Sequence, residues 1–127
     1  MRFKRSYGWV LIVVLAIVLI IRLLQGNKAG NATLEDRNPA HLSFTRHARC
    51  RMECREISEA DVRYILQHGT INNRKSDPDD RPCPSVAVEG YSPEDKHHLR
   101  IVVGTCDKET RVITCIDLDQ DFTCNCP

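Results

Sequence analysis

The segment FTRHARCRMECR, residues 44–55, places one histidine and two cysteines where they could act together. His47, Cys50 and Cys54 follow one another at intervals of three and four residues, so on a helix they share one face. A face of this kind suits three kinds of chemistry, which are metal binding, disulfide formation and acid–base catalysis by the imidazole. The spacing alone does not choose among them.

Cysteines give the strongest of these signals. All seven lie after residue 24, and this number is high for a small domain. Cys50 and Cys54 lie one helical turn apart, and Cys124 and Cys126 form a Cys-x-Cys pair, so neither pair bridges well within itself. The spacing predicts either two disulfides between helix and tail, which an oxidising compartment favours, or one zinc site with four thiolates.

The remaining cysteines are Cys83, Cys106 and Cys115. Cys106 and Cys115 lie on two strands of one predicted hairpin, but a tight turn offsets them by about four residues, which is too far to bond. Strand alternation also places both on the sheet face opposite the helices. Cys83 is then the expected partner of one of them, and the seventh cysteine has no partner within the chain.

His47 could serve as a general acid or base, because an imidazole titrates near neutral pH, with Arg46 or Arg51 holding a phosphate. No carboxylate is spaced along the sequence so that it would be recognised as a catalytic partner of His47. A structural role for this histidine is therefore favoured. His97 and His98 fall in a predicted hairpin turn, where we expect them to be solvated. We therefore assign no catalytic residue, and His47, Arg46 and Arg51 stay candidates.

Residues 6–24 form an apolar run, long enough for a transmembrane signal-anchor helix when Arg22 reaches the interface. Basic residues precede it, so the positive-inside rule places residues 1–5 in the cytoplasm and residues 25–127 outside, in the periplasm if the host is Gram-negative. A cleaved signal peptide is the other interpretation and delivers the domain to the same side. Residues 25–40 contain Gly, Asn and Pro without apolar periodicity, which predicts a flexible stalk.

The sequence pattern after residue 40 predicts the helices and strands that position the candidate residues. An extended segment at residues 41–44 precedes a helix at 45–55, and Ser58 and Gly69 cap a second helix. Three antiparallel strands follow at residues 85–91, 98–105 and 111–118. Residues 41–127 therefore predict an extracytoplasmic, cysteine-rich α+β domain of order β-α-α-β-β-β, with two helices packed on one face of a small antiparallel sheet. Alternation predicts its buried strand residues: Leu99, Ile101, Val103, Val112, Thr114, Ile116 and Leu118.

The charge of this domain limits its partners. The chain has 18 basic and 17 acidic residues, and its first 24 residues hold four of the basic ones and no acidic one. The remainder carries 14 basic and 17 acidic residues, a net charge of −3. Phosphate contacts need accumulated positive charge, so a nucleic-acid partner is not expected. The membrane is the expected partner, through residues 6–24, and no protein partner is indicated.

The segment FTRHARCRMECREISEADVRYILQHG, residues 44–69, resembles the bacterial domain of unknown function family 4258. VIT at residues 112–114 is similar to the last strand of that family, and the resemblance spans residues 42–118. Seven residues stand where the family motif has them: Thr45, Arg46, His47, Ala48, Arg51, Met52 and Arg55. The chain looks like a membrane-anchored, cysteine-rich branch. The resemblance implies a fold similar to RelE and barnase-like small ribonucleases, in which His47 or a neighbouring arginine would act on a phosphate.

These observations favour a non-catalytic, disulfide-stabilised domain tethered to a membrane, with a binding or structural role and no cofactor. Two alternatives stay open. One is an RNase-like hydrolase centred on His47. The other is a thiol redox or metal-binding protein that uses Cys50, Cys54, Cys124 and Cys126, with zinc as the metal.

Overall fold

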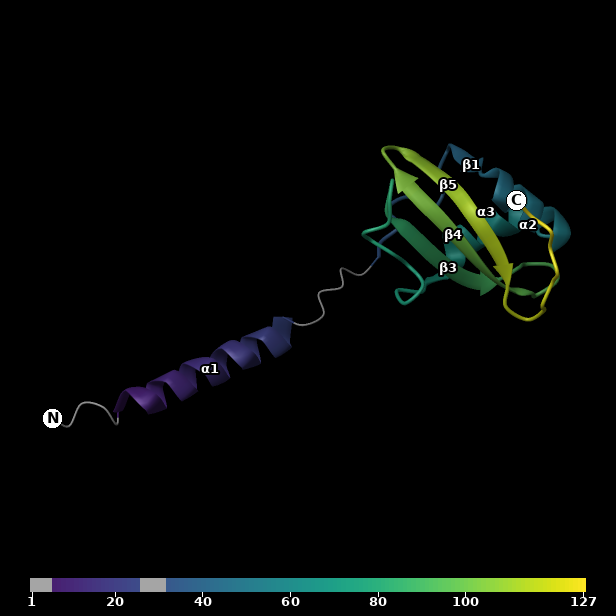
Figure 1. The fold of residues 1–127 in the computed structure, drawn as a ribbon. Helices are drawn as coiled ribbons and strands as arrows, with labels where there is room; N and C mark the ends of the chain where they lie inside the picture. The colour runs from purple at the N-terminus through teal and green to yellow at the C-terminus, as the bar shows by residue number, and fades with distance from the viewer. Residues whose placement is uncertain (1–5, 26–31) are drawn as a thin grey trace. The chain divides into compact units, whose positions relative to one another are not determined.

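The computed structural model describes residues 6–25 and 32–127, which belong to two separate units. The described part of the first unit is a helix, and the second unit, Ala32–Pro127, is an α+β domain (Figure 1). Residues 1–5, predicted to be cytoplasmic, and residues 26–31 of the predicted stalk lie outside the described residues.

Helix α1 (Ser6–Gln25) consists almost entirely of apolar residues. Its segment Tyr7–Leu24 has 18 residues. At 1.5 Å per residue it measures about 27 Å, close to the thickness of the hydrocarbon core of a bilayer. None of this segment is buried against the described part of the chain. The helix is therefore long and apolar enough to cross a membrane, and a signal sequence would have the same properties.

The domain is built on a five-stranded sheet with the strand order β1-β5-β4-β3-β2. Its strands are β1 (Leu42–Phe44), β2 (Thr70–Ile71), β3 (Ser85–Tyr91), β4 (His98–Cys106) and β5 (Glu109–Asp117). Helices α2 (Arg46–Cys54) and α3 (Glu59–His68) lie on one face of this sheet and share one hydrophobic core with it (Figure 1). The α+β class predicted from the sequence is confirmed.

Two features of the sheet differ from the predicted antiparallel β-α-α-β-β-β arrangement. β1 pairs with β5 in parallel, so the sheet is mixed, and β2 adds a short antiparallel pair with β3. The parallel pair joins the first and last strands of the domain, and no local sequence pattern encodes such a distant pairing. β2 has only two residues and therefore no alternation to detect.

Local side-chain chemistry fixes the ends of both helices. The Thr45 hydroxyl accepts a hydrogen bond from the Ala48 amide at the start of α2, and Ser58 and Asp61 form a reciprocal capping box at the start of α3. Gly69 ends α3 where the chain passes close to β3. A Cβ atom at this position would lie 2.6 Å from a carbonyl oxygen of β3, so a larger residue would force the junction apart.

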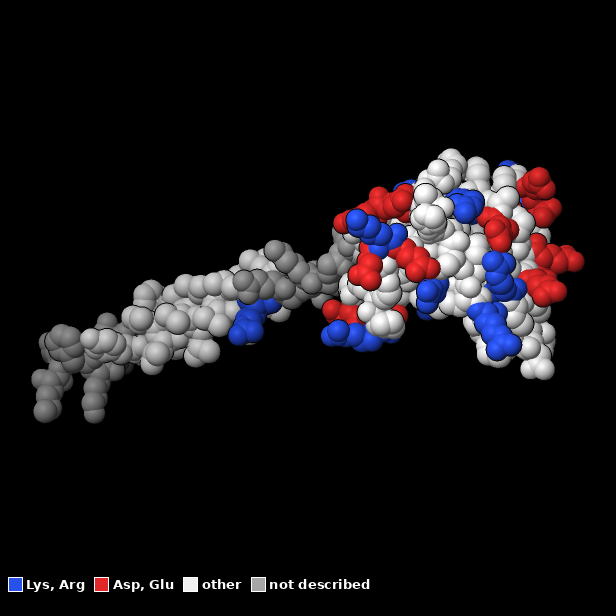
Figure 2. All heavy atoms as spheres, turned by 90° about the horizontal axis from the view of Figure 1, so that it is seen from above, with Lys and Arg blue, Asp and Glu red and all other residues white. Residues whose placement is uncertain are grey.

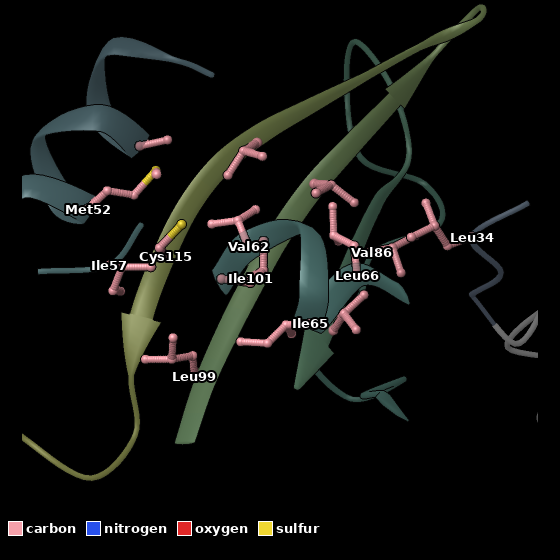
Figure 3. Close-up of a cluster of buried hydrophobic side chains, with 14 residues drawn as sticks. Leu34, Met52, Ile57, Val62, Ile65, Leu66, Val86, Leu99, Ile101 and Cys115 are labelled. Carbon is pink, nitrogen blue, oxygen red and sulfur yellow. The ribbon is translucent and has the colours of Figure 1, made fainter. Parts of the chain in front are cut away.

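A bulge in β5 changes which of its residues face the core. The pairing register between β4 and β5 shifts between Val102 and Val103, which makes Ile113 an extra residue in β5. After this extra residue, side chains that simple alternation would point outward point inward instead. Cys115 is one of them and is fully buried. Figure 3 shows it in the same cluster of buried side chains as Met52.

The predicted buried face is therefore correct before the bulge and wrong after it. Leu99, Ile101, Val103 and Val112 are buried as predicted. Thr114, Ile116 and Leu118 are only half-buried, and the fully buried positions are Cys115 and Asp117 instead. The prediction that Cys115 lies on the face opposite the helices is wrong for the same reason.

Residues 32–40 pack on the domain, although the sequence prediction placed them in a flexible stalk. Leu34 is part of the hydrophobic core, and Arg37 donates hydrogen bonds to two carbonyl oxygens at the end of α3. Arg63 of α3 donates to the carbonyl oxygen of Pro39. The folded unit therefore begins at Ala32 and not at residue 41.

Candidate functional site

The C-terminal tail, residues 118–127, runs back along α2 (Figure 1). Two disulfides join the tail to this helix. Cys50 is bonded to Cys126 and Cys54 to Cys124, with Cα–Cα distances of 5.7 and 6.0 Å. The spacings match, because four helical residues rise about 6 Å and two residues of extended chain advance roughly 7 Å. Of the two arrangements that the spacing left open, the structure has the pair of disulfides.

His47 continues this row of contacts one turn closer to the start of α2. Its Nδ1 atom lies 2.9 Å from the carbonyl oxygen of Pro127, and its Nε2 atom accepts a hydrogen bond of 3.4 Å from Nε of Arg51. Both ring nitrogens thus have partners within the chain. Arg46 is exposed. The structure brings His47 and Arg51 together, and it places the tail against the histidine.

The third disulfide joins Cys83, in the loop before β3, to Cys106 at the end of β4. Cys115 is unpaired and buried, and burial raises the pKa of its thiol to about 12. It is therefore a packing residue with little thiolate character. Within residues 6–25 and 32–127, no three His, Cys, Asp or Glu side chains are grouped as a metal site requires.

A polar pocket of about 320 Å³, which we call the Arg55 pocket, lies at the C-terminal end of α2. Three segments that are distant in sequence line it. Residues 55–57 come from the junction between α2 and α3, Asp95 and His97 from the connection between β3 and β4, and Gln120 and Phe122 from the tail. The disulfides that attach the tail to α2 therefore also hold one wall of this pocket.

An ion pair with a buried carboxylate holds His97 in the Arg55 pocket. Its Nδ1 atom lies 3.0 Å from Oδ2 of Asp117, and the side chain of Asp117 is 0% exposed against 37% for His97. The other oxygen of Asp117 accepts hydrogen bonds from the amides of Asp119 and Gln120. Because Nδ1 is held by Asp117, Nε2 is the ring nitrogen left for a ligand.

The surroundings of this pair shift both of its pKa values. The hydrogen bond with Asp117 raises the pKa of His97. Burial acts to raise the pKa of Asp117, but the hydrogen bonds from His97 and from two backbone amides outweigh it, and the net effect lowers that pKa. The ion pair is therefore charged over a wider pH range than the isolated groups would be.

Arg55 is the second cation of the pocket. Its Nη1 atom donates to the carbonyl oxygen of Cys115, on the part of β5 that β1 does not reach, and its Nε atom is buried without a hydrogen-bond partner. Burial lowers the pKa of Arg55, and the nearby Arg51 acts in the same direction, yet a guanidinium stays charged at neutral pH. It makes no ion pair with a carboxylate of the described residues. The carboxylates of Asp117 and Asp121 act on Arg55 from a distance and oppose the lowering of its pKa, but neither forms an ion pair with it. Direct pairing with the guanidinium is therefore left open to an anionic ligand group.

Sequence reasoning missed this pocket. Simple alternation along residues 111–118 predicts that Asp117 faces outward, which leaves His97 as a solvated turn residue without a partner. The bulge turns Asp117 inward instead. One signal was available, because His97 and Asp117 stand at the same end of the hairpin formed by β4 and β5.

A second hollow, of about 400 Å³, lies between α3 and β3. Two stacked ring pairs line it, Tyr64 with His68 and Tyr91 with His98, with centroid distances of 4.4 and 4.6 Å. His98 thus belongs to this hollow, whereas its neighbour His97 lines the Arg55 pocket.

Residues 44–117, more than half of the chain, match the family model described as Domain of unknown function (DUF4258). The matched region contains both domain helices, strands β2 to β5, and the residues Arg55, His97 and Asp117. The tail lies outside it. No curated protein and no solved structure matches the chain.

Proposed function

The chain belongs to the DUF4258 family, and we propose that it is a single-pass membrane protein whose domain lies outside the cytoplasm and binds a ligand there without catalysis. The observation that carries this proposal is the pairing of six cysteines as three disulfides in a domain that follows an apolar helix. Disulfides persist in oxidising extracytoplasmic compartments and are rare in the cytosol. The Arg55 pocket is the proposed binding site.

The charges around α1 support the orientation of the chain. Arg2, Lys4 and Arg5 precede the apolar run, and positive residues flank a span on its cytoplasmic side. In this orientation residues 32–127 face the periplasm if the host is Gram-negative. Cleavage after the apolar run would release the same domain on the same side, and the disulfides would be equally stable there.

The contacts of His47 favour binding over catalysis. A general acid or base needs a ring nitrogen within hydrogen-bond reach of the substrate, but both nitrogens of His47 have partners within the chain, and one of these belongs to the disulfide-bonded tail. A ribonuclease also needs positive charge for the phosphates. Figure 2 shows basic and acidic side chains interspersed over the visible face of the domain. These features support a binding domain over the RNase-like hydrolase.

Protease added to intact spheroplasts tests the orientation. We expect residues 32–127 to be removed, because the domain faces outward, while a tag placed at residue 1 is protected. Protection of the whole domain in intact spheroplasts, with cleavage after lysis, would reverse the assignment.

An RNA-degradation assay with the full-length protein in detergent tests the absence of catalysis. We expect no turnover from the wild type and hence no difference from His47→Ala. His41→Ala, at an exposed histidine just before β1, is the matched control. Turnover that His47→Ala abolishes and His41→Ala preserves would replace the binding proposal with the hydrolase.

A further inference from the structure

The Arg55 pocket contains two cationic groups that can still accept a ligand. Arg55 donates to a backbone carbonyl through Nη1 and makes no ion pair with a described carboxylate. His97 is bound through Nδ1 to the buried Asp117, so its Nε2 atom is left for another partner. A guanidinium and an imidazolium that line one small pocket form a donor set for a carboxylate or another small anion.

Acidic side chains line the same pocket. Glu56 directly follows Arg55, Asp95 lies in the connection between β3 and β4, and Asp61 stands in the first turn of α3. Asp61 is engaged with Ser58 in the capping box, whereas Glu56 and Asp95 make no ion pair within the described part of the chain. These two carboxylates repel a polyanion and suit an ammonium group.

We propose that the Arg55 pocket binds a small zwitterion, namely a free amino acid or a short peptide. The ligand carboxylate pairs with Arg55 and with Nε2 of His97, and the ligand ammonium pairs with Glu56 and Asp95. The volume, about 320 Å³, is at the lower end of the roughly 300–1,000 Å³ typical of small-molecule pockets. The ring of Phe122 supplies apolar contact. This inference rests on the proposed binding function and adds the class of ligand.

A zwitterion fits this pocket better than an ion of either sign. A lone anion such as phosphate would meet the two cations but would also face the carboxylates of Glu56 and Asp95. A lone cation would face Arg55 within the same small volume. Only a molecule that carries both charges can pair with the two cations and with the two carboxylates. A single ion pairs with one of these sets and is repelled by the other.

Isothermal titration calorimetry on the full-length protein in detergent tests the ligand class. Glycine and glycylglycine are the zwitterionic probes, acetate and ethylammonium each carry one of the two charges, and inorganic phosphate tests a simple anion site. We expect glycylglycine to bind at least tenfold more tightly than acetate, ethylammonium or phosphate.

Two variants with matched controls locate the binding. His97→Gln and Asp95→Asn each remove one charge from the pocket, and each should weaken glycylglycine binding at least tenfold. His98→Gln changes the neighbouring histidine, which stacks on Tyr91 in the other hollow, and Glu94→Gln changes an exposed neighbour of Asp95. Both controls should bind as the wild type does. Asp95 is itself exposed, so its substitution leaves the fold intact even where His97→Gln does not.

Three results would overturn the proposal. They are acetate or phosphate binding as tightly as glycylglycine, no heat of binding with any probe, and equal losses in the pocket variants and their controls. None of these results affects the orientation of the chain or its lack of turnover on RNA. Failure of the ligand class is therefore distinguishable from failure of the proposed orientation and of the proposed absence of catalysis, which the protease and RNA assays test.

Discussion

Several residues of the family motif on α2 connect this helix to the sheet and the core. Thr45 caps α2 and also donates through its hydroxyl to a carbonyl oxygen of β5, while Arg55 donates to another β5 carbonyl further along. Ala48 and Met52 are buried in the core. The hydrogen bonds of Thr45 and Arg55 give partners to carbonyl oxygens at the edge of β5, beyond the three residues that pair with β1. This part of the motif therefore has a structural explanation that requires no activity.

Replacing Thr45 by Ala should lower the free energy of unfolding by roughly 1–2 kcal/mol. The substitution removes an N-cap, whose loss costs about 0.5–2 kcal/mol, and leaves the Ile113 carbonyl without its hydroxyl partner. Urea unfolding measures the change. Thr123→Ala, at an exposed tail position, is the control, and we expect an effect within about 0.5 kcal/mol. Equal losses in the two variants would contradict the capping role of Thr45.

The ion pair of His97 and Asp117 should make stability depend on pH. The pKa of His97 is raised above 6.5, so its contribution is fully present below pH 6.5 and is lost as the pH rises through the folded-state value. The pKa of Asp117 is lowered below 3.8, so its contribution is present above pH 3.8 and is lost as the pH falls through the folded-state value. The pair therefore stabilises the domain most between pH 3.8 and pH 6.5.

Thermal unfolding as a function of pH tests this window. The difference in Tm between the wild type and His97→Gln should be largest inside the window and should shrink above it as His97 loses its proton. His98→Gln should follow the wild type across the whole range, because its ring stacks on Tyr91 away from Asp117. A difference between wild type and His97→Gln that stays constant from pH 4 to pH 9 would show that the pair does not titrate as described.

At the scale of elements, the attachment of the tail to α2 is the main covalent constraint. The tail has no helix or strand, so few backbone contacts hold it. The bridge from Cys54 to Cys124 spans a sequence separation of 70 residues, which in the chain-entropy model is worth about 4 kcal/mol. Once it has formed, the bridge from Cys50 to Cys126 closes only a short additional loop and contributes less.

Removing both helix-to-tail bridges should therefore cost at least about 4 kcal/mol, and removing either one alone should cost less. The variants replace the cysteines by Ser in pairs, and urea unfolding measures the free energy of unfolding. The pair Cys83→Ser and Cys106→Ser is the control, because it removes a disulfide with a separation of 23 residues and leaves the tail attached. If the variant without tail bridges were no less stable than this control, the tail would contribute little to the fold.

The elements differ in how much of them the sequence can predict. Both helices have local signals, since Thr45 and Ser58 are cap residues with apolar positions at helical spacing behind them. The bulge has none, because the run VITCI at residues 112–116 is mostly apolar at both odd and even positions. Either register would bury apolar side chains, and only the pairing with β4 chooses between them. The inward facing of Cys115 and Asp117 follows from that choice.

At the scale of the whole molecule, the two units also differ in how much of them the sequence can predict. The apolar length of α1 can be read from composition, because crossing a bilayer depends on length and hydropathy alone. The Arg55 pocket cannot, because Arg55, His97 and Phe122 come together only through the sheet and the disulfides. The spacing of the cysteines predicts an attachment of the tail to the helix, by two disulfides or by zinc, but neither which cysteines pair nor the pocket that the attached tail completes.

The oxidation state of the cysteines in the membrane-bound protein tests the central claim most directly. Thiols are alkylated in intact cells before lysis, and the protein is then unfolded and alkylated with a second reagent. Trypsin separates Cys50 from Cys54 at Arg51, and fragmentation of the tail peptide between Cys124 and Cys126 identifies the partner of each. Mass spectrometry of the linked peptides then gives the connectivity.

We predict three linked pairs, Cys50 with Cys126, Cys54 with Cys124 and Cys83 with Cys106, and one thiol, Cys115, that is alkylated only after unfolding. The late alkylation follows from burial, which raises the pKa of that thiol to about 12. Seven thiols alkylated in intact cells, or four thiols protected until a chelator releases one zinc ion, would contradict a disulfide-stabilised domain and support the thiol redox or metal-binding alternative.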